Sequence, residues 1–511
     1  MNKTKFLAVL LLCLSLLLPA CGTTPPDPSA PDSNASSTTD AATTEAPAET
    51  ESPYDEKGFL KDDLPEDLDF NDLTVHVYLG DYNKAYAVDM YSEGYNSERL
   101  NDAIYNMIKN VEDRLNVKLD YTIESYAWSN YTEHQSTVTS RILANDDSID
   151  LILDNPNYAY AMLENEYFVD LSETKYVNED MPWYNQTIIN SLPTDYLHFL
   201  SGDFSIANVK NSFAMYFNAD LYKALGNTED LYSVVDSGKW TLEKMETLIK
   251  DCYSDLNGND ASDPKDRFGL TFGDTNKYLG FNAAFDARIF TKTDDGFEFT
   301  YGNEHATDVA NKLIDFVNNN TNVLKGQANG QETKFPDQMI SSGGGNNASR
   351  IFIEGRSLFT CSLVADAPAI IDAIDFEYGL LPYPKWNEEQ ENYQTALQRS
   401  CYALIPVSTS IEDEASAVLE ALSSESHRTL MPEYCEITLK TRYSQDSNVS
   451  RMFDLISDSI IYDPGEIYSN GSPGGFIRYA INAKLNWTSH IAANREALVT
   501  KMQEVVDHWK K

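Results

Sequence analysis

Hydrophobic and polar positions change period in a regular order along the first part of the chain. Residues 73–79 alternate between apolar and polar types, which predicts a β-strand. Apolar residues then recur at helical spacing from Leu100 to Leu115, and Asn116 follows as a residue that tolerates the left-handed conformation of a helix end. Residues 117–123 alternate again. This strand–helix–strand order predicts a parallel strand pair with a right-handed crossover.

Strand and helix patterns continue to the C-terminus. Helical spacing predicts helices at 131–144, at 241–256 with Thr241 as N-cap, and at 309–317, and it dominates after Glu412. Short apolar or alternating runs predict strands at 149–153, 357–362, 376–381 and 400–405. The predicted fold class is therefore α/β. No repeat of 20–50 residues is visible, which argues against a solenoid.

The N-terminus has a different pattern. A short basic start precedes an apolar run from Phe6 to Leu18. This order is typical of a secretory signal peptide, and about 13 apolar residues are fewer than the roughly 20 that a membrane-spanning helix needs. Leu18-Pro19-Ala20-Cys21 also resembles the lipobox of bacterial lipoproteins. That resemblance implies a signal peptide at 1–20, a lipid on Cys21, and attachment to the extracellular face of the cell membrane.

The next segment lacks the residues that build a core. From 22 to 52 the chain contains only Gly, Thr, Pro, Asp, Ser, Ala, Asn and Glu. Such a segment buries too little apolar surface to order itself, so residues 21–53 are predicted to be a disordered lipoprotein stalk. The body that starts near Tyr54 exceeds the about 250–300 residues at which one core stops growing, which predicts two lobes or domains.

Charge narrows the range of partners. The formal net charge is −42, which disfavours nucleic acid and anionic lipid headgroups and suits neutral or cationic ligands. The chain also has 31 Tyr residues, a type that recognises amphipathic ligands such as sugars but that also fills cores. After Cys13 and Cys21, four cysteines remain: Cys252, Cys361, Cys401 and Cys435. They allow three pairings if all are oxidised, but their scattered positions favour buried thiols.

No catalytic motif stands out. No two of the seven histidines lie within five residues of each other, and HExxH and GxSxG are absent. Gly343-Gly344-Gly345 lacks the Lys-Ser/Thr of a phosphate loop. A glycosidase carboxylate pair cannot be chosen among 80 acidic residues, because its spacing is set by the fold. We therefore expect neither an enzyme nor a catalytic cofactor.

One acidic segment matches a structural calcium loop. Residues 255–266 place oxygen side chains at positions 1, 3, 5, 9 and 12, which is the spacing of an EF-hand loop. The predicted Ca²⁺ ligands are Asp255, Asn257, Asn259, the carbonyl of Ala261, Asp263 and Asp266. Position 6 is Asp260 where the EF-hand has glycine, and an ordinary polar turn is the alternative.

Several short stretches, in order across about 400 residues, resemble extracellular solute-binding proteins of family 1, the sugar-binding receptors of bacterial ABC importers. They are Leu100-Asn101-Asp102-Ala103-Ile104-Tyr105, Val111–Val117, Asp150–Leu153, Met215–Leu221, Gly238–Leu242, Phe352–Gly355, Tyr378–Lys385 and Tyr402–Pro406. Residues 255–266 also resemble a calcium loop of some oligosaccharide-binding members.

This resemblance implies a two-lobed periplasmic-binding-protein-like fold (type II) with a hinge between the lobes. Lobe 1 is expected at 54–203 and 377–442, and lobe 2 at 204–376 and 443–511. The implied function is a lipid-anchored, monomeric receptor for a carbohydrate or oligosaccharide, with ABC permease subunits as partners and the closed state as the form they recognise.

Ligand is expected at the carboxyl ends of the strands. The nominated residues follow predicted strands or lie near the crossings between lobes: Tyr82, Trp128, Asn155, Tyr158, Tyr160, Asn211 and Arg399. Tyr and Trp would stack on sugar faces, and Asn and Arg would bond hydroxyls. Trp240 is interpreted as structural, and Trp183 as either. The alternative function is a surface lipoprotein of another class, a glycan-cleaving enzyme or a receptor coupled to a sensor.

Overall fold

The computed structural model describes residues 52–509 apart from 146, 156–164, 295, 328–338, 344–345, 437–446 and 469–474. The chain divides into two units, Met1–Pro53 and Tyr54–Lys511. The elements described below all belong to the second unit. Its strands form two main sheets, and each sheet with its helices is called a lobe.

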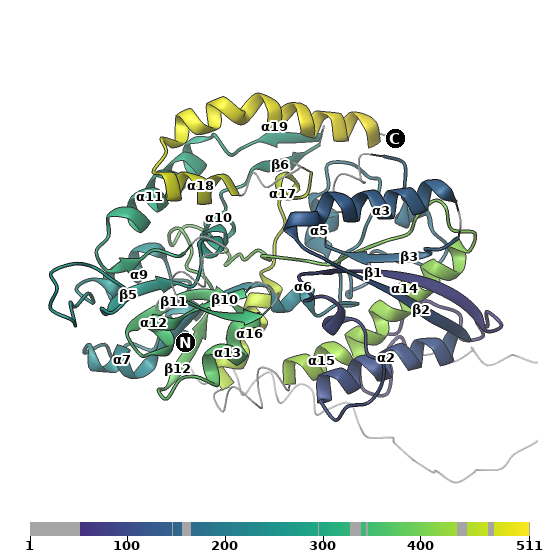
Figure 1. Cartoon of the computed structure of the whole chain (residues 1–511), viewed down its shortest axis with the longest axis horizontal. Coiled ribbons are helices and arrows are strands. Elements are labelled where there is room, and N and C mark those ends of the chain that lie inside the picture. The colour runs from purple at the N-terminus through teal and green to yellow at the C-terminus, as the bar shows by residue number, and fades with distance from the viewer. Residues whose placement is uncertain are drawn as a thin grey trace, which may run out of the picture. The chain divides into compact units, whose positions relative to one another are not determined.

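Lobe 1 is built on the sheet order β13-β3-β1-β2. Its strands are β1 (Leu73–Tyr82), β2 (Val117–Tyr126), β3 (Leu151–Asp154) and β13 (Tyr402–Leu404). β1 pairs in parallel with β2 and β3, as the strand–helix–strand pattern predicted, and β13 returns antiparallel to β3. Figure 1 shows α3 (Tyr131–Ala144) on one face of the sheet and α2 (Arg99–Leu115) with α14 (Glu412–Arg428) on the other.

The helix α2 follows its sequence pattern closely. Its apolar positions, from Ile104 to Leu115, are buried. Asn116 ends the helix in the left-handed conformation, at φ +50°. The remaining helices of this lobe are α5 (Gln186–Ser191) and α15 (Leu430–Tyr434). Both α14 and α15 contact α2, so chain segments far apart in the sequence close one core.

Lobe 2 is built on the sheet order β12-β4-β11-β5-β8. Its strands are β4 (Phe213–Asn218), β5 (Phe268–Phe272), β8 (Val323–Leu324), β11 (Ser357–Leu363) and β12 (Tyr378–Leu381). Two hairpins accompany it, β6 (Phe290–Thr293) with β7 (Gly296–Phe299) and β9 (Met339–Gly343) with β10 (Asn346–Ser349). Its helices are α7 (Ala219–Ala224), α8 (Leu231–Asp236), α9 (Leu242–Ile249), α10 (Leu279–Ala284), α11 (Glu304–Asn319), α12 (Arg350–Ile353), α13 (Ala367–Ile371), α16 (Ser447–Asp458), α17 (Pro464–Tyr468), α18 (Gly475–Ala483) and α19 (Trp487–Trp509).

One boundary of the expected lobes is wrong. Residues 377–442 were assigned to lobe 1, but β12 pairs antiparallel with β4 in the sheet of lobe 2. The chain therefore returns to lobe 1 only between β12 and β13. The physical reason is that strand partners are chosen by packing across the sheet, and a local alternation pattern carries no information about the neighbour.

The helix predicted at 241–256 is also shorter than expected. Thr241 caps it by accepting a hydrogen bond from the backbone N–H of Lys244, as predicted, but α9 ends at Ile249. Asp251 adopts the left-handed region at φ +62°, which turns the chain away. Cys252 remains buried, whereas Leu256 is exposed.

The chain crosses between the lobes through short segments. The first leads through α6 (Ala207–Lys210) into β4, and the second joins β12 to β13. We call residues 395–401 of the second the crossing segment. Its backbone pairs with Ser212 at the first crossing and with Ile460 beyond α16. The strands that join the lobes thus lie together.

Two tryptophans belong to the core. Trp183 and Trp240 are fully buried, and the indole N–H of Trp240 donates to the carbonyl of Pro382 at 2.9 Å. This confirms the structural interpretation of Trp240 and settles Trp183 as a core residue. Among the described residues, no helix has the length and apolarity needed to span a membrane.

Candidate functional site

The carboxyl edges of both sheets meet the crossing segment. In lobe 1, β1 ends at Tyr82, and the guanidinium carbon of Arg399 lies 5.7 Å from the centre of its ring. In lobe 2, Lys277 follows β5, and its ammonium donates to the side-chain carbonyl of Gln398 at 3.1 Å. Neighbouring residues of one segment therefore touch the two edges at which ligands bind in open α/β sheets.

A cavity of about 150 Å³ lies at this junction. Its lining comes from the crossing segment, from β13 of lobe 1, and from α10, α17 and the start of β4 in lobe 2. The polar lining residues include Asn282, Arg288, Gln398, Arg399, Ser400, Tyr402, Tyr462, Asp463 and Glu466. The cavity is smaller than the roughly 300–1,000 Å³ of most ligand sites, but it combines aromatic walls with converging polar groups as such sites do.

A pair of aromatic side chains lies beside Arg399 at the carboxyl edge of the lobe 1 sheet. Tyr82 and Tyr126 are register partners at the ends of β1 and β2, and their ring centres lie 5.5 Å apart. The Tyr126 hydroxyl donates to Asp154 at 2.6 Å, and the His134 ring stacks on Tyr126 at 3.7 Å. His134 Nε2 also lies 2.7 Å from Asp154. These buried contacts hold the Tyr126 ring in one orientation beside Tyr82.

A glycine makes room for this network. A Cβ atom at Gly80 would lie 2.1 Å from a carboxylate oxygen of Asp154. Any larger residue there would push Asp154 away from Tyr126 and His134. Sequence reasoning missed Tyr126, although its place at the end of a strand parallel to β1 is the signal that would have found it.

Two carboxylates on the lobe 2 side differ in their bonding. Asp463 accepts hydrogen bonds from the backbone N–H groups of Ile289 at 2.5 Å, Phe290 at 3.3 Å and Gly465 at 2.8 Å. Glu466 lines the cavity, and its carboxyl group makes no hydrogen bond or ion pair within the described part of the chain. The surrounding protein and the Asp463 carboxylate raise the pKa of Glu466 to about 8, and the Arg478 guanidinium opposes the rise.

A buried lysine orients Gln398. Lys277 is fully buried, with carboxylate oxygens of Asp274 and Asp366 at 3.8 and 3.7 Å from its nitrogen. Because the Gln398 carbonyl accepts from Lys277, the amide NH₂ of Gln398 points away from that lysine as a donor. Glu466 and Gln398 thus offer an acceptor and a donor to the same cavity.

The structure brings together some of the nominated residues. Tyr82 and Arg399 face each other, as described. Asn211 is buried where the chain crosses between the lobes. Its backbone carbonyl accepts a hydrogen bond from the backbone N–H of Gln398 at 3.0 Å. Asn155 is fully buried, and its side-chain amide donates a hydrogen bond to the Tyr86 hydroxyl at 2.6 Å. The amide therefore points into the core of lobe 1.

Three further nominated residues are not placed by the structure. The backbone of Trp128 begins a short 3₁₀ helix, Trp128–Asn130, while its side chain lies outside what the structure describes. Tyr158 and Tyr160 lie outside the described residues. Cys21 also lies outside them.

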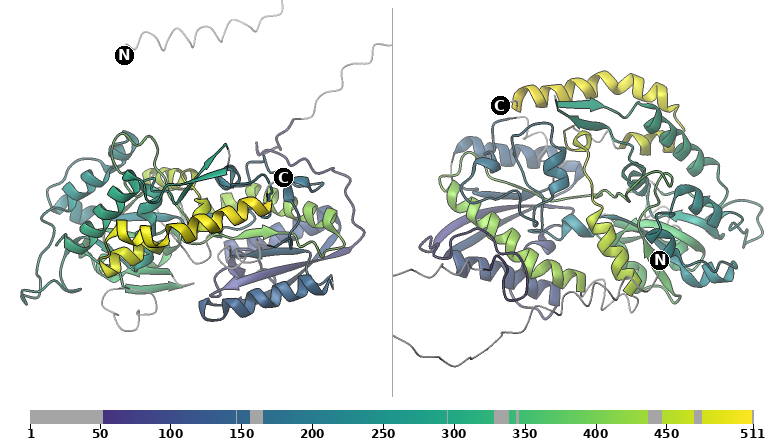
Figure 2. Two further views of the ribbon diagram at one scale, coloured as in Figure 1. Left: turned by 90° about the horizontal axis from the view of Figure 1, so that it is seen from above. Right: turned by 180° about the vertical axis from the view of Figure 1, so that it is seen from behind.

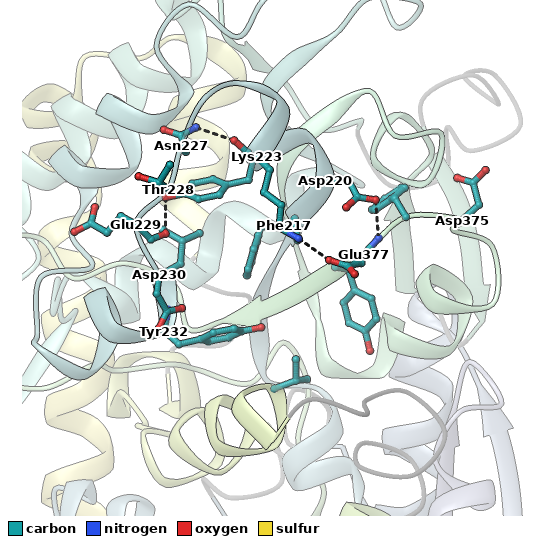
Figure 3. A pocket seen from close by; sticks show the side chains of 16 residues that line it. Phe217, Asp220, Lys223, Asn227, Thr228, Glu229, Asp230, Tyr232, Asp375 and Glu377 are labelled. Atoms are coloured by element: carbon teal, nitrogen blue, oxygen red, sulfur yellow. Dashed lines mark hydrogen bonds and ion pairs between the residues drawn. The ribbon is translucent and has the colours of Figure 1, made fainter.

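A wider groove of about 850 Å³ lies elsewhere, on lobe 2 (Figure 3). Its walls come from β4, α7, α8, α16 and the residues before β12, all within that lobe. Lys223 pairs with Glu377 at 2.7 Å, and Lys244 pairs with Glu229 at 2.5 Å. This groove does not join the lobes, so we place the functional site in the smaller cavity at the crossing.

The predicted calcium loop has a defined geometry. The amides of Asn257 and Asn259 converge on one oxygen of Asp263, at 3.0 and 2.6 Å. Asp260 occupies the EF-hand glycine position in the left-handed conformation, at φ +57°. Asp255 accepts from the backbone N–H groups of residues 257, 258 and 260. These bonds lower the pKa of Asp255 and favour its ionised form.

Asp266 differs from the other predicted ligands. It is fully buried and accepts from the N–H groups of Leu256 and Asp263 and from the hydroxyl of Tyr253. Within the described chain, no group of three His, Cys, Asp or Glu side chains surrounds one point. A cation here would rely on Asp255, Asp263, the two asparagines and the carbonyl of Ala261.

The four cysteines of the described chain lie at scattered places in the fold. Cys252, Cys361 and Cys401 are buried, and Cys435 is half-buried. Burial raises the pKa of Cys252 to about 11. Cys252, Cys361 and Cys401 therefore fill core positions, which requires no regular spacing between them along the chain.

Comparison with known proteins settles the fold. No protein-family model matches the sequence, and no curated protein matches it either. An extracellular solute-binding protein from Staphylococcus aureus in complex with maltose superimposes with a TM-score of 0.54 at 10% identity, over 87% of this chain and 99% of that chain. The chain has a solute-binding protein fold.

Two further structures agree. A cyclo/maltodextrin-binding protein complexed with maltotetraose gives a TM-score of 0.52 at 12% identity, over 86% of this chain and 98% of that chain. An ABC substrate-binding protein from Listeria monocytogenes in complex with cycloalternan gives 0.51 at 11% identity, over 84% and 99%. The two-lobed α/β fold implied by the sequence resemblance is confirmed.

Proposed function

We propose that the protein is a receptor that binds a carbohydrate or oligosaccharide between its lobes and delivers it to an ABC importer. The observation that carries this proposal is the meeting of both carboxyl sheet edges at the crossing segment, where Gln398, Arg399 and Glu466 line one cavity and Tyr82 lies beside Arg399. Proteins of the same fold were solved with maltose, maltotetraose and cycloalternan, which supports a sugar as ligand.

Each side chain has a role that suits a neutral sugar. The apolar face of a sugar ring stacks on an aromatic ring, which Tyr82 offers. Glu466 accepts hydrogen bonds from hydroxyl groups, and the amide of Gln398 donates to a hydroxyl oxygen. Arg399 sits over Tyr82 and contributes further donors. The ligand then touches both lobes, and its binding energy favours the closed arrangement.

The chemistry of the cavity favours binding over cleavage. Glycoside hydrolysis uses two carboxyl groups that flank the scissile bond. The Asp463 carboxylate already accepts hydrogen bonds from three backbone N–H groups. Of this pair, Glu466 is therefore the one that can bond a ligand. We therefore assign no reaction to the site.

Calorimetry against oligosaccharides tests the binding function. Maltose and maltotetraose come first, followed by other glucans and xylans. A ligand at 100 times its Kd stabilises the folded protein by about 2.7 kcal/mol, so a thermal shift identifies it. Glu466→Gln should weaken binding about tenfold or more, because it replaces a carboxyl group that can bond two sugar hydroxyls through its oxygens with an amide that has a single oxygen acceptor. Asp375→Asn changes an acid of the wider groove on lobe 2. It is the matched control and should leave the Kd unchanged.

Two outcomes redirect the assignment. Shorter glycans appearing on incubation would identify an enzyme. Sugar binding without any loss of labelled-sugar uptake in a deletion strain would identify a receptor that reports to a sensor. No binding across the panel would overturn the carbohydrate proposal.

The anchoring proposal rests on the signal peptide pattern and the lipobox-like residues before Cys21. Lipid on Cys21 would hold the body on the extracellular face of the membrane through the 21–53 segment. Cys21→Ala should release the protein from the membrane fraction or leave it unprocessed. Continued incorporation of labelled fatty acid into that variant contradicts the assignment.

We further propose that residues 255–266 bind a structural Ca²⁺. The convergence of Asn257 and Asn259 on Asp263 supports it, because side-chain amides can turn to present their oxygens to a cation. Asp266 anchors the loop through its bonds to Leu256 and Tyr253. The loop lies in lobe 2, so the ion would stabilise that lobe and take no direct part in ligand binding.

A further inference from the structure

The last helix, α19, belongs to lobe 2 along most of its length. The Trp487 ring at its start packs against Tyr301 with ring centres 4.9 Å apart. Arg495, further along, lies 5.4 Å from the centre of the Phe299 ring in β7. The helix also contacts α11 and α17. Its first turns are therefore fixed to the helices and the β6–β7 hairpin of lobe 2.

The final turn of α19 leaves lobe 2 and packs on lobe 1. The Trp509 ring lies 4.4 Å from the Tyr196 ring and 4.0 Å from the His198 ring, measured between centres. Trp509 is 6% exposed in this position. Figure 1 and the view from behind in Figure 2 both show α19 running from one lobe to the other.

The receiving segment is firmly part of lobe 1. The Tyr196 hydroxyl donates to the carbonyl of Phe168 at 3.0 Å. Leu200, two residues after His198, pairs with Ala403 of β13 through hydrogen bonds in both directions. Trp509 thus touches the segment that runs beside β13 of the lobe 1 sheet, whereas the rest of its helix is carried by lobe 2.

The contact is apolar in character. His198 is 1% exposed, and neither of its ring nitrogens has a hydrogen-bond partner in the described structure. Burial lowers the pKa of His198 to about 3, so the ring is neutral at physiological pH. His198 therefore packs against Trp509 as an aromatic surface.

This placement has a mechanical consequence. Within the described residues, the last turn of α19 connects the lobes at a place apart from the segments through which the chain crosses between them. A rotation of one lobe about the crossing segments would draw Trp509 away from Tyr196 and His198, because a packed helix moves with the lobe that carries it. We propose that the Trp509 turn is a latch that sets the equilibrium between interlobe arrangements, independently of any ligand.

Distance measurements on the ligand-free full chain test this latch. Spin labels at Leu143→Cys on α3 of lobe 1 and Thr228→Cys on lobe 2 report the interlobe distance. The background carries Ser in place of Cys13, Cys21 and Cys435, because the remaining cysteines, Cys252, Cys361 and Cys401, are buried. Trp509→Ala should raise the ratio of displaced to native-like distances about tenfold, which corresponds to about 1.4 kcal/mol. Trp509→Phe keeps a ring and should restore most of the parent distribution.

The same pair of labels provides the controls. Tyr196→Ala removes the contact from the lobe 1 side and should reproduce the effect, and the double variant should add little beyond either single change. Trp386→Ala removes a half-buried tryptophan that packs on Phe285 and His305 within lobe 2, so it should leave the distances unchanged. An unchanged distribution in Trp509→Ala, or an equal shift in Trp386→Ala, overturns the proposal.

Discussion

Glu420 links the stability of lobe 1 to pH. This residue of α14 is 1% exposed, and it accepts hydrogen bonds from the Tyr184 hydroxyl at 2.7 Å and from the backbone N–H of Asn178 at 3.3 Å. Its other carboxylate oxygen has no partner in the described structure. Burial raises the pKa of Glu420 to about 7 from an ordinary 4.5.

The pH dependence follows from proton binding. Between about pH 4.5 and 7 the folded state holds this proton and the unfolded chain does not, so the free energy of unfolding falls as the pH rises. Glu420→Gln removes the titration. Relative to the parent protein, the variant should gain about 3 kcal/mol between pH 4.5 and pH 8. Denaturant unfolding at both pH values measures it.

An exposed glutamate on the same helix gives the control for this prediction. Glu412→Gln, in the first turn of α14, should show the same difference from the parent at both pH values. A Glu420→Gln stability difference that does not change with pH would mean that burial does not shift this carboxyl.

Sequence patterns locate strand ends but not side-chain directions. Tyr82 and Arg399 were found because they follow or precede a strand at the sheet edge. Asn155 occupies the same kind of position, yet it points into the core toward Tyr86. Glu466 went unnoticed because a single acid among 80 acidic residues has no local signature, and only the fold brings it to the cavity.

At the scale of the element, long periodic patterns predict structure well and short loops less so. The helix α2 and the strands β1 and β2 appear where the patterns indicated, and α2 and β1 each bury an apolar face, whereas β2 is buried only at its two end residues. The helix α9 ends early because a left-handed residue, Asp251, follows it. That early end creates the turn that leads into the calcium loop.

Metal removal tests the calcium loop. The ionised Asp255 and Asp263 carboxylates lie in an already anionic chain, so a cation should stabilise the loop. Thoroughly chelated protein should melt a few degrees lower, and Ca²⁺ should restore the melting temperature better than Mg²⁺, which prefers a tighter octahedral shell. Asp255→Ala combined with Asp263→Ala should abolish the response.

The loop contains its own matched control. Asp260→Asn changes an acid that is not a predicted ligand and keeps a residue type that tolerates the left-handed conformation. It should retain the calcium response. A melting curve that chelation and calcium both leave unchanged would leave residues 255–266 as a polar turn.

At the scale of the molecule, the two-lobed design was predictable and one boundary was not. Length required more than one core, and the family resemblance implied lobes joined by crossing strands. β12 was nevertheless assigned to the wrong lobe, because its partner β4 lies about 160 residues earlier in the chain and no local pattern records that pairing.

Ligand should close the lobes. Tyr82 belongs to lobe 1 and Glu466 to lobe 2, so a sugar that contacts both gains binding energy only when they approach. A ligand shifts an equilibrium by its differential affinity for the two states. Small-angle scattering should therefore show a smaller radius of gyration with the oligosaccharide that gives the largest thermal shift. Glu466→Gln should keep the ligand-free radius and require roughly tenfold more sugar to reach the compact state. A sugar that raises the melting temperature while the radius stays constant would mean that it binds to one lobe alone.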